Sequence, residues 1–470
     1  MGALKKLIKS IVDAFEERTG LIKIMTDLAE HPVPPDTGWW YVFGSATAVA
    51  FMIQVVTGIA LATSYVSSSG SAYDSLQFIT THALMGNLLR GMHYFGASAM
   101  VLLVGIHMGQ VFLMGCYKYP REFNWLTGVV LLFLTLAMGF TGQLLRWDQN
   151  AVWSVVVGAE QAGRTPIIGD MLARFLLAGK TIGGATLSRF FAFHVFFIPA
   201  IIFGFVGIHL FLVLHDGISE PPKVGEPVDP ATYREKYEKL VTEKGVPFWP
   251  DAAWRDVVFC VAVVLAVFIL ALVFGPPTLD KPPNPSMLAK DPAPDWYLLW
   301  YFALLALIPH KMTTPVILLA PLTGIIVLLL VPIASNKGER HPRKRPWAVA
   351  SVIVIVMMIG TLWVEAIREP WSPDFRAEPL PTSVVGTNIG PVVTGAALFH
   401  EKGCEYCHEI EGFGGHRGPS LTWVGDRLTR ADLTVRIMNG GYNMPAFAGL
   451  LSAGELDDLT AFLESRHKER

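Results

Sequence analysis

The sequence predicts an all-α membrane protein with seven membrane-spanning helices followed by a small all-α domain. Three observations predict this fold: the composition, seven long apolar stretches, and a change to polar residues after residue 367. Of the 470 residues, 52% are hydrophobic and 16% are charged, against about 25% charged in soluble domains. The net charge of −2 gives no support for a nucleic-acid ligand, and four cysteines are too few for a disulfide framework. The composition therefore excludes a disordered chain and an ordinary soluble enzyme.

Seven apolar stretches are long enough to cross a lipid bilayer, which takes about 20 residues. They cover residues 39–65, 92–116, 125–145, 190–215, 254–274, 314–334 and 347–367. A further apolar run, 296–309, is too short to cross, so we expect a helix at the membrane interface. Residues 3–29 alternate lysine with apolar residues and are expected to form an amphipathic helix on the membrane surface.

Lysine and arginine in the short loops set the predicted orientation. The loop between spans six and seven is strongly basic, and the loops after spans two and four are also basic, whereas the loop after span one has only Arg90. The positive-inside rule then places the N-terminus in the cytoplasm and the C-terminus outside. The long loop between spans three and four is also basic and weakens this count.

Residues 404–408 read Cys-Glu-Tyr-Cys-His, the attachment pattern for a covalent c-type haem. The two thiols would form thioethers with the haem vinyl groups, and His408 is placed to ligate the iron. A zinc site would need a second pair of ligands, and a redox dithiol would not need His408. We therefore predict one c-type haem held by Cys404, Cys407 and His408, in an extracytoplasmic domain.

A methionine of this domain is expected to be the second axial ligand, because a thioether raises the haem potential. Met444 is the first candidate, since Pro445 holds its backbone in an extended loop. Met438 is the alternative, although on a helix expected at 430–438 it also suits the core.

Four histidines lie in two of the predicted spans at matching intervals. His93 and His107 in span two are fourteen residues apart, and His194 and His209 in span four are fifteen apart. At about 1.5 Å and 100° per residue, each pair shares one helix face and is separated by about 21 Å along the axis. Because both spans cross in the same direction, we expect His93 to face His194 on the outer side. His107 would face His209 on the inner side, and each pair would hold one non-covalent b-type haem.

Residues near the histidines support this interpretation. Membrane histidines can also bond to neighbouring helices, but two register-matched pairs favour ligation, because an unliganded polar group in lipid is costly. The flanking spans repeat the interval in glycines that would let a porphyrin edge approach the backbone; they are Gly44, Gly58, Gly128 and Gly142. Arg90 and Arg189 precede the outer histidines and are expected either to pair with haem propionates or to extend to the interface.

Several stretches resemble cytochrome b of the Rieske–cytochrome b family, the quinol:cytochrome c (or plastocyanin) oxidoreductases. Residues 185–194 (ATLSRFFAFH) are similar to the family's approach to the fourth span, and 282–285 (PPNP) and 294–297 (PDWY) to its second half and quinol-site signature. The resemblance covers residues 33–367. The seven spans resemble plastoquinol-type complexes, in which the protein is split in two, but here the halves are fused.

The sequence departs from the family at several positions. Asp295 replaces the usual glutamate of Pro-Glu-Trp-Tyr and is one methylene shorter. Residues 142–147 lose a tyrosine and a proline near the outer quinol pocket. Val42 stands where plastoquinol-type complexes have a cysteine for an additional inner haem, so a covalent third haem is not expected. Leu214 and His215 replace basic residues after the inner ligand.

The resemblance implies quinol oxidation on the outer side of the membrane, with Asp295 and Tyr297 as catalytic residues. A carboxylate there can accept a quinol proton and release it outward. One electron would pass to a Rieske iron–sulfur protein, and the other through both b-type haems to a quinone near the cytoplasmic surface. As an alternative, Asp295 would serve as the N-cap of the following helix.

The expected organisation follows from these assignments. The chain lacks a second cysteine–histidine set for a Rieske cluster, so we expect that protein to be a separate subunit. The resemblance implies a dimeric complex, and we expect this complex in the bacterial inner membrane. The electron acceptor would be the C-terminal haem, with further cytochrome c subunits or a soluble acceptor after it. The parts are a surface segment (1–37), a four-helix cytochrome b haem bundle (38–220), a three-helix quinol-site half (221–368), a linker (369–391) and a cytochrome c domain (392–470).

Two other functions remain open from the sequence. A haem-containing membrane anchor would connect quinone to a separate dehydrogenase without splitting the electrons, but a four-helix anchor needs none of the three later spans. A redox sensor would carry a signalling domain, and the sequence shows none. We therefore expect the cytochrome b and c subunit of a proton-translocating quinol oxidoreductase.

Overall fold

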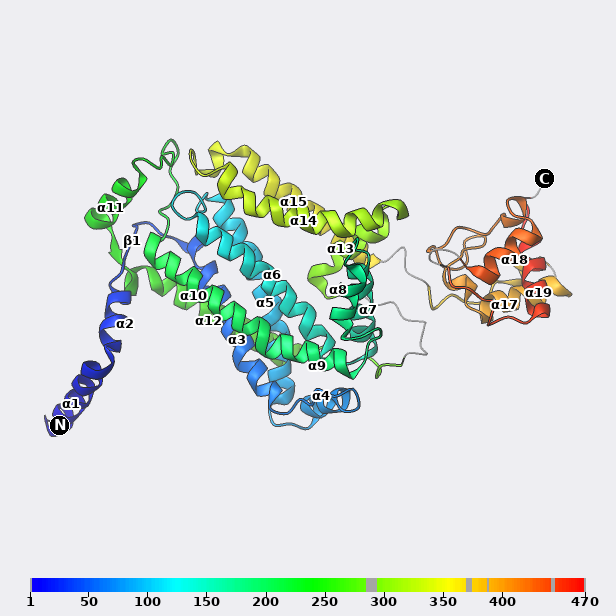
Figure 1. Cartoon of the computed structure of the whole chain (residues 1–470), viewed down its shortest axis with the longest axis horizontal. Helices are drawn as coiled ribbons and strands as arrows, with labels where there is room; N and C mark the ends of the chain where they lie inside the picture. The colour runs from blue at the N-terminus through cyan, green and yellow to red at the C-terminus, as the bar shows by residue number, and fades with distance from the viewer. Residues whose placement is uncertain (1, 285–293, 369–373, 387–388, 441–443, 469–470) are drawn as a thin grey trace. The chain divides into compact units, whose positions relative to one another are not determined.

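The computed structural model confirms the all-α fold and the seven membrane spans (Figure 1). It describes residues 2–284, 294–368, 374–386, 389–440 and 444–468. Within these residues, seven helical stretches are long and apolar enough to cross a membrane. They are α3 (Phe43–Ala62), α5 (Gly86–Leu113), α6 (Glu122–Leu144), α9 to α10 (Gly184–Asp216), α12 (Ala253–Phe274), α14 (His310–Ala334) and α15 (Pro346–Arg368). The chain is therefore a multi-pass membrane protein.

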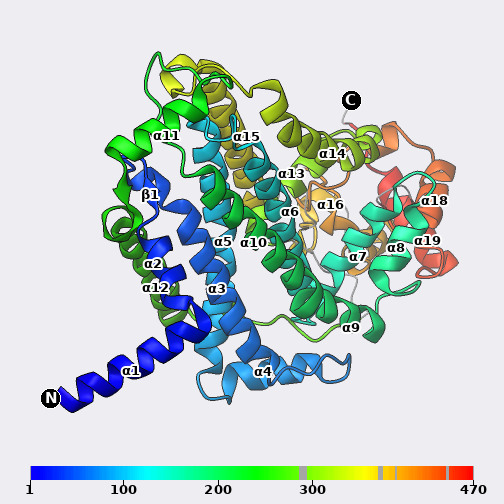
Figure 2. The same cartoon turned by 60° about the vertical axis from the view of Figure 1, so that its left-hand side comes forward.

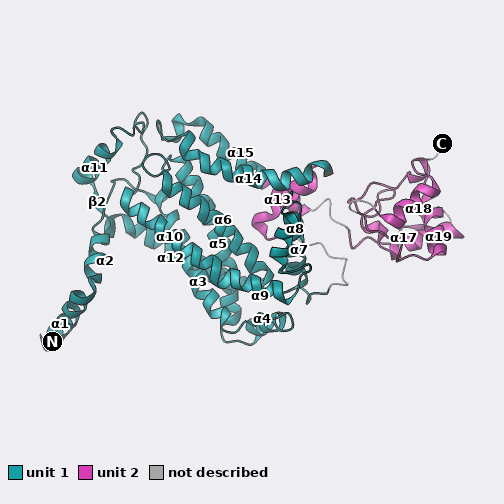
Figure 3. Ribbon diagram, in the orientation of Figure 1, with its two compact units in different colours: residues 1–284, 311–358 teal, residues 285–310, 359–470 magenta. Residues whose placement is uncertain are grey.

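The chain divides into two compact units, which Figure 3 shows in different colours. The first contains Met1–Asn284 and Lys311–Met358, and the second contains Pro285–His310 and Ile359–Arg470. In the first unit, α5 packs against α3, α6 and α12, and α6 packs against α10 (Figure 2). The main core cluster consists of Ala46, Ala50, Phe51, Met100, Leu103, Ile198 and Ile202. Small side chains such as the two alanines let the helix backbones approach closely.

Short helices and a small sheet connect the spans of the first unit. The helices are η1 (Trp39–Tyr41), α4 (Ala72–Thr81), α7 (Gln149–Gly163), α8 (Gly169–Leu177), α11 (Tyr233–Lys244), η3 (Phe248–Ala252) and η5 (Pro342–Lys344). Strand β1 (Pro32–Val33) pairs antiparallel with β2 (Val246–Pro247). This pairing ties the segment before span one to the segment before span five, so the two halves of the membrane region are joined through the backbone.

The N-terminal surface segment forms two helices, α1 (Gly2–Thr19) and α2 (Leu21–Ala29), where the sequence predicted one. Gly20 divides them because its φ of 61° is left-handed and ends the first helix. The apolar side chains of α1 are exposed, as expected of a helix whose apolar face is covered by lipid. They are Leu4, Leu7, Ile8, Ile11, Val12 and Phe15.

Span four contains a π-helical turn, η2 (Phe193–Phe197), between α9 (Gly184–Ala192) and α10 (Ile198–Asp216). A π turn inserts one extra residue into an α-helix. The fifteen-residue interval after His194 therefore covers nearly the same rise and rotation as the fourteen-residue interval in α5, which is one continuous α-helix. This is the physical reason why unequal intervals in the two spans can be in register.

Buried cations hold the ends of several spans at one end of the first unit. Arg121 donates to the carbonyls of Asp216 at 3.0 Å and Gly217 at 2.9 Å, at the end of α10, and to Tyr233 Oη at 2.7 Å. The carbonyls at a helix C-terminus lack intrahelical partners and carry the negative end of the helix dipole. Three more buried cations donate to backbone carbonyls there: Lys118, Arg340 and Arg345.

The second unit contains the short apolar helix, predicted to lie at the interface, and the C-terminal domain. This short helix is η4 (Trp296–Leu298) with α13 (Leu299–Leu307). The domain contains α16 (Thr382–Val385), α17 (Pro391–Glu401), η6 (Cys404–Tyr406), η7 (Val424–Asp426), α18 (Arg430–Asn439) and α19 (Ala453–Glu464). Leu380, Val384 and Val385, within the stretch predicted as a linker, pack into the domain's core. Residues 369–373 and 387–388 of that stretch lie outside the described residues.

Replacing Arg121 by glutamine should destabilise the first unit by about 2 kcal/mol, because charged hydrogen bonds to the end of α10 are lost. The measurement is thermal unfolding in detergent, followed by circular dichroism. Lys239→Gln is the matched control, since Lys239 is exposed on α11 and its ion pair among the described residues is with the exposed Glu243, at 3.9 Å. Equal unfolding midpoints for the two variants would contradict a structural role for Arg121.

Candidate functional site

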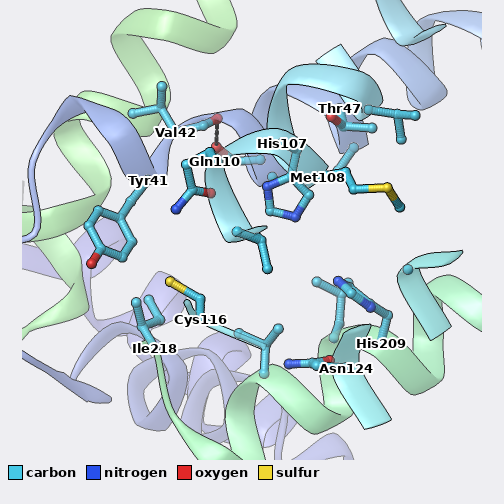
Figure 4. Close-up of a pocket in the computed structure, with 18 of the residues that line it drawn as sticks. Tyr41, Val42, Thr47, His107, Met108, Gln110, Cys116, Asn124, His209 and Ile218 are labelled. Carbon is cyan, nitrogen blue, oxygen red and sulfur yellow. Dashed lines mark hydrogen bonds between the residues drawn. The ribbon is translucent and has the colours of Figure 1, made fainter. Parts of the chain in front are cut away.

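The four histidines predicted from the sequence come together as two pairs in the first unit. The rings of His93 on α5 and His194 on η2 have centroids 6.2 Å apart and planes inclined by 77°. This separation leaves room for an iron between the rings, with metal–nitrogen bonds of about 2 Å on each side. His107 and His209 line a common cavity of about 410 Å³, shown in Figure 4. The pairing therefore follows the predicted order along both helices.

Each of the four predicted glycines lies against one of these histidines. An added Cβ would stand 2.6 Å from His194 Cε1 at Gly142, 3.2 Å from His93 Cε1 at Gly58, 3.3 Å from His107 Cε1 at Gly44, and 3.6 Å from His209 Cε1 at Gly128. Helices α3 and α6 therefore present bare backbone beside both histidine pairs. A flat ring system can lie against this bare backbone, whereas a side chain at the glycine positions would occupy the same space.

The predicted arginines bond to the protein near the outer pair. Arg90 donates to Thr80 Oγ1 and to the carbonyl of Pro277, each at 2.9 Å, and Arg189 donates to the carbonyl of Phe175. Asp148, which is fully buried, forms an ion pair with Arg146 at 3.4 Å, and both interact electrostatically with Arg90. Two cations thus surround one carboxylate, which leaves an excess positive charge.

The cavity at the inner pair extends beyond the histidines towards Tyr41 and Cys116 (Figure 4). Asp256 from α12 also lines it and accepts a hydrogen bond from Ser45 Oγ. An ionisable group on a membrane-spanning helix is costly to keep and marks a functional site. Asp256 is therefore a candidate proton donor or acceptor in this cavity.

Asp295 and Tyr297 lie in the second unit at the start of the interfacial helix. Tyr297 Oη donates to Asp295 Oδ2 at 3.4 Å. Asp295 occupies the N-cap position, but among the described residues its carboxylate makes no capping hydrogen bond to the first turn. Helix capping therefore does not explain why an aspartate occupies this N-cap position. Pro285, the last residue of the predicted PPNP motif, lies outside the described residues.

The residues of the predicted c-type attachment form one loop in the C-terminal domain. Burial raises the pKa of the Cys404 thiol to about 12 and lowers the pKa of His408. At neutral pH the thiol is therefore protonated and the imidazole is neutral, whereas a reactive dithiol needs a lowered pKa. His408 Nδ1 bonds to the carbonyl of Pro419 at 2.9 Å, which leaves Nε2 available as a ligand. Cys407 lies at the C-cap of η6.

Two further features shape this loop. The ring of His408 lies against Gly418, where an added Cβ would stand 2.5 Å from Cε1. The fully buried Glu405 pairs with His400 of α17 and ties the attachment loop to that helix. Sequence reasoning missed this pair, since a glutamate between two cysteines gives no sign of its burial.

The two candidate methionines both belong to this domain. Met444 is partly buried and packs against the core, while Met438 is partly buried on α18. Asn443, just before Met444, lies outside the described residues. Both methionines are therefore candidates for the second axial position.

Comparisons with known proteins identify the membrane part. The family model for cytochrome b/b6/petB matches residues 28–217, and the model for cytochrome b(C-terminal)/b6/petD matches residues 282–373. The menaquinol:cytochrome c reductase cytochrome b subunit of Bacillus subtilis (strain 168) is 38% identical over 224 residues, which are 46% of this chain and 100% of that protein. The chain belongs to the cytochrome b family.

Further similarities support this membership. Cytochrome b6 of Heliobacterium mobile is 40% identical over 208 residues, 44% of this chain and 98% of that protein. A solved structure described as a hyperthermophilic respiratory Complex III matches with a TM-score of 0.64 and 28% identity, covering 76% of this chain and 91% of that one. The family model for cytochrome c oxidase, cbb3-type, subunit III matches residues 390–463, so the C-terminal domain is of the cytochrome c type.

Cytochrome b and cytochrome c domains imply haem, and the described residues fit it. The membrane bundle provides opposed imidazoles with bare glycine backbone beside each pair. The C-terminal loop provides two protonated thiols and a neutral imidazole. Haem held at these places would supply one-electron transfer.

Sequence reasoning missed two kinds of residue at this site. Asp256 was overlooked, although the adjacent charges Arg255 and Asp256 at the start of an apolar span were an available signal. The threonine hydroxyls that form hydrogen bonds with three of the four membrane histidines were also overlooked. Their signal is a Thr-Gly dipeptide at three of the four predicted glycines, at 57–58, 127–128 and 141–142.

Gly142→Ala should lower the b-type haem content of the purified protein to about half, because the new methyl group overpacks the ring of His194. Gly128→Ala in the same helix is the matched control, since its methyl group would meet His209 at an ordinary contact distance of 3.6 Å. The ratio of b-type to c-type absorption measures the result. Equal ratios in both variants would show that the bare backbone at Gly142 is not needed.

Proposed function

We propose that this cytochrome b is the cytochrome b and c subunit of a membrane quinol:cytochrome c oxidoreductase. The observation that carries the proposal is the two histidine pairs, one above the other along α5 and along the fourth span, where His194 lies on η2 and His209 on α10. Together they provide an electron path across the membrane. The relative from Bacillus subtilis, named a menaquinol:cytochrome c reductase subunit, and the Complex III structure support the same assignment.

The chain's own residues divide the reaction between two places. Asp295 accepts a proton from quinol at the outer site, and Tyr297 positions that carboxylate through its hydroxyl. His93 with His194, and His107 with His209, would each hold one haem, and these two groups would supply one-electron transfer across the membrane. Asp256 holds a proton at the inner cavity for a quinone that takes up the electrons.

The second electron follows a route outside the bilayer. A separate Rieske subunit receives it from the quinol and passes it to the haem held by Cys404, Cys407 and His408, with Met444 as the first candidate for the second ligand. Further cytochrome c subunits or a soluble acceptor follow. Arg90, whose surroundings carry an excess positive charge, and Arg189 would hold the propionates of a haem at the outer pair.

The topology couples this reaction to proton transport. We place the N-terminus in the cytoplasm of a bacterium, the chain in the inner membrane, and the C-terminal domain outside, in agreement with the basic loops between spans. Protons are then released outside at Asp295 and taken up inside at Asp256. The complex is proposed to be dimeric.

A redox-titrated optical spectrum of the purified complex, with and without an inhibitor of the outer quinol site, tests the function. The proposal expects two b-type centres of different potential, one c-type centre, and c-type reduction by quinol that the inhibitor blocks. One b-type centre, or c-type reduction that the inhibitor leaves unchanged, would favour a haem-containing anchor instead.

Asp295→Asn should lower quinol-driven c-type reduction about 100-fold or more, because an amide cannot accept the proton. Asp295→Glu should retain most of the activity, since it restores the carboxylate. The haem potentials of both variants should match those of the wild type. Asparagine caps a helix as well as aspartate does, so full activity of Asp295→Asn would show that Asp295 is only an N-cap.

A further inference from the structure

Three threonines place their hydroxyl oxygens on the Nδ1 atoms of membrane histidines. Thr57 Oγ1 lies 2.9 Å from His93 Nδ1, Thr127 Oγ1 lies 2.9 Å from His209 Nδ1, and Thr141 Oγ1 lies 3.3 Å from His194 Nδ1. Each threonine immediately precedes a glycine that faces the same histidine. One Thr-Gly dipeptide thus provides both the hydroxyl and the bare backbone for each ring.

The same hydroxyls also bond to their own helices. Thr57 Oγ1 lies 2.6 Å from the carbonyl of Ile53, Thr127 Oγ1 lies 3.0 Å from that of Phe123, and Thr141 Oγ1 lies 2.8 Å from that of Ala137. A carbonyl oxygen can only accept, and a hydroxyl has one proton to donate. The hydroxyl proton is therefore directed to the helix, a bond that threonine commonly makes within helices.

The direction of this bond determines which histidine nitrogen carries the proton. Because the threonine oxygen has no second proton, it can only accept a hydrogen bond from Nδ1. Nδ1 is thus protonated, and the lone pair is on Nε2, the nitrogen that faces away from the threonine.

We propose that Thr57, Thr127 and Thr141 are positioning residues that hold three histidines in the haem-ligating tautomer. This inference rests on the proposed function, in which these histidines ligate haem. A hydroxyl that accepts a hydrogen bond from Nδ1 fixes the orientation of the ring and makes its metal-binding nitrogen, Nε2, more basic. The threonines then favour the oxidised iron, which binds a basic ligand more strongly.

His107 is the exception among the four. Its Nδ1 atom is buried and has no hydrogen-bond partner in the described part of the chain. The residue before its glycine, Gly44, is Phe43. In the outer pair both histidines therefore bond to a threonine, whereas in the inner pair only His209 does so among the described residues. The outer pair would stabilise the oxidised form of an iron more strongly. This difference favours electron movement from the outer to the inner pair.

The test is a redox titration of the b-type optical bands in the purified complex. Thr57→Val and Thr141→Val should each raise the midpoint potential of one b-type centre, and Thr127→Val should raise that of the other. A tenfold change in the relative affinity for the two iron states corresponds to about 59 mV. Serine at each position keeps the hydroxyl and should restore the wild-type potential or, where valine loses the haem, the missing centre.

Thr135→Val is the matched control. Thr135 lies on α6 like Thr127 and Thr141, is buried, and donates to the carbonyl of Leu131 at 2.8 Å, and among the described residues it makes no hydrogen bond to a histidine. Its replacement should leave both potentials unchanged. Unchanged potentials in the three valine variants, or equal shifts in the valine and serine variants, would overturn the inference. A wild-type protein without two b-type centres would instead contradict the proposed function.

Discussion

The structure of the membrane bundle depends on supplying partners for both nitrogens of an imidazole ring placed among apolar helices. Both ring nitrogens need partners, because an unpaired polar group away from water costs free energy. In His93, His194 and His209, one nitrogen is available to a metal and the other bonds to a threonine hydroxyl of a neighbouring helix. A flat cofactor between two such rings also needs backbone without side chains beside it. The histidines, the glycines and the threonines of spans one to four are therefore parts of one arrangement.

The remainder of the first unit keeps this arrangement in register. The π turn at His194 compensates for one additional residue in span four. Buried cations bind the carbonyl ends of the spans, so that helices carrying ligands do not slide along one another. The pairing of β1 with β2 joins the segments that precede the first and fifth spans. A membrane region that family models match in two parts is thus one continuous chain, with a cytochrome c-type domain after it.

The cavity beside the inner histidines illustrates where sequence reasoning stops. Tyr41, Cys116 and Asp256 are distant in sequence and have no common motif, yet they line the same space. Their proximity results from packing of α12 against α3 and α5, a contact that hydropathy cannot predict. In the C-terminal domain, the burial of Glu405 against His400 is similarly a product of packing, since the sequence shows only a charged residue between two cysteines.

The sequence by itself determined the features that depend on periodicity and residue type. Span number follows from apolar length, and the facing of the histidine pairs and their glycines follows from helical spacing. The c-type attachment stays a prediction from five consecutive residues. Only the tertiary structure decided the direction of the threonine hydrogen bonds, the π turn that reconciles two unequal intervals, and the residues of the inner cavity. The physical reason is that hydrogen-bond direction and cavity lining depend on atoms brought together by packing between helices, whereas helical spacing is a property of each helix alone.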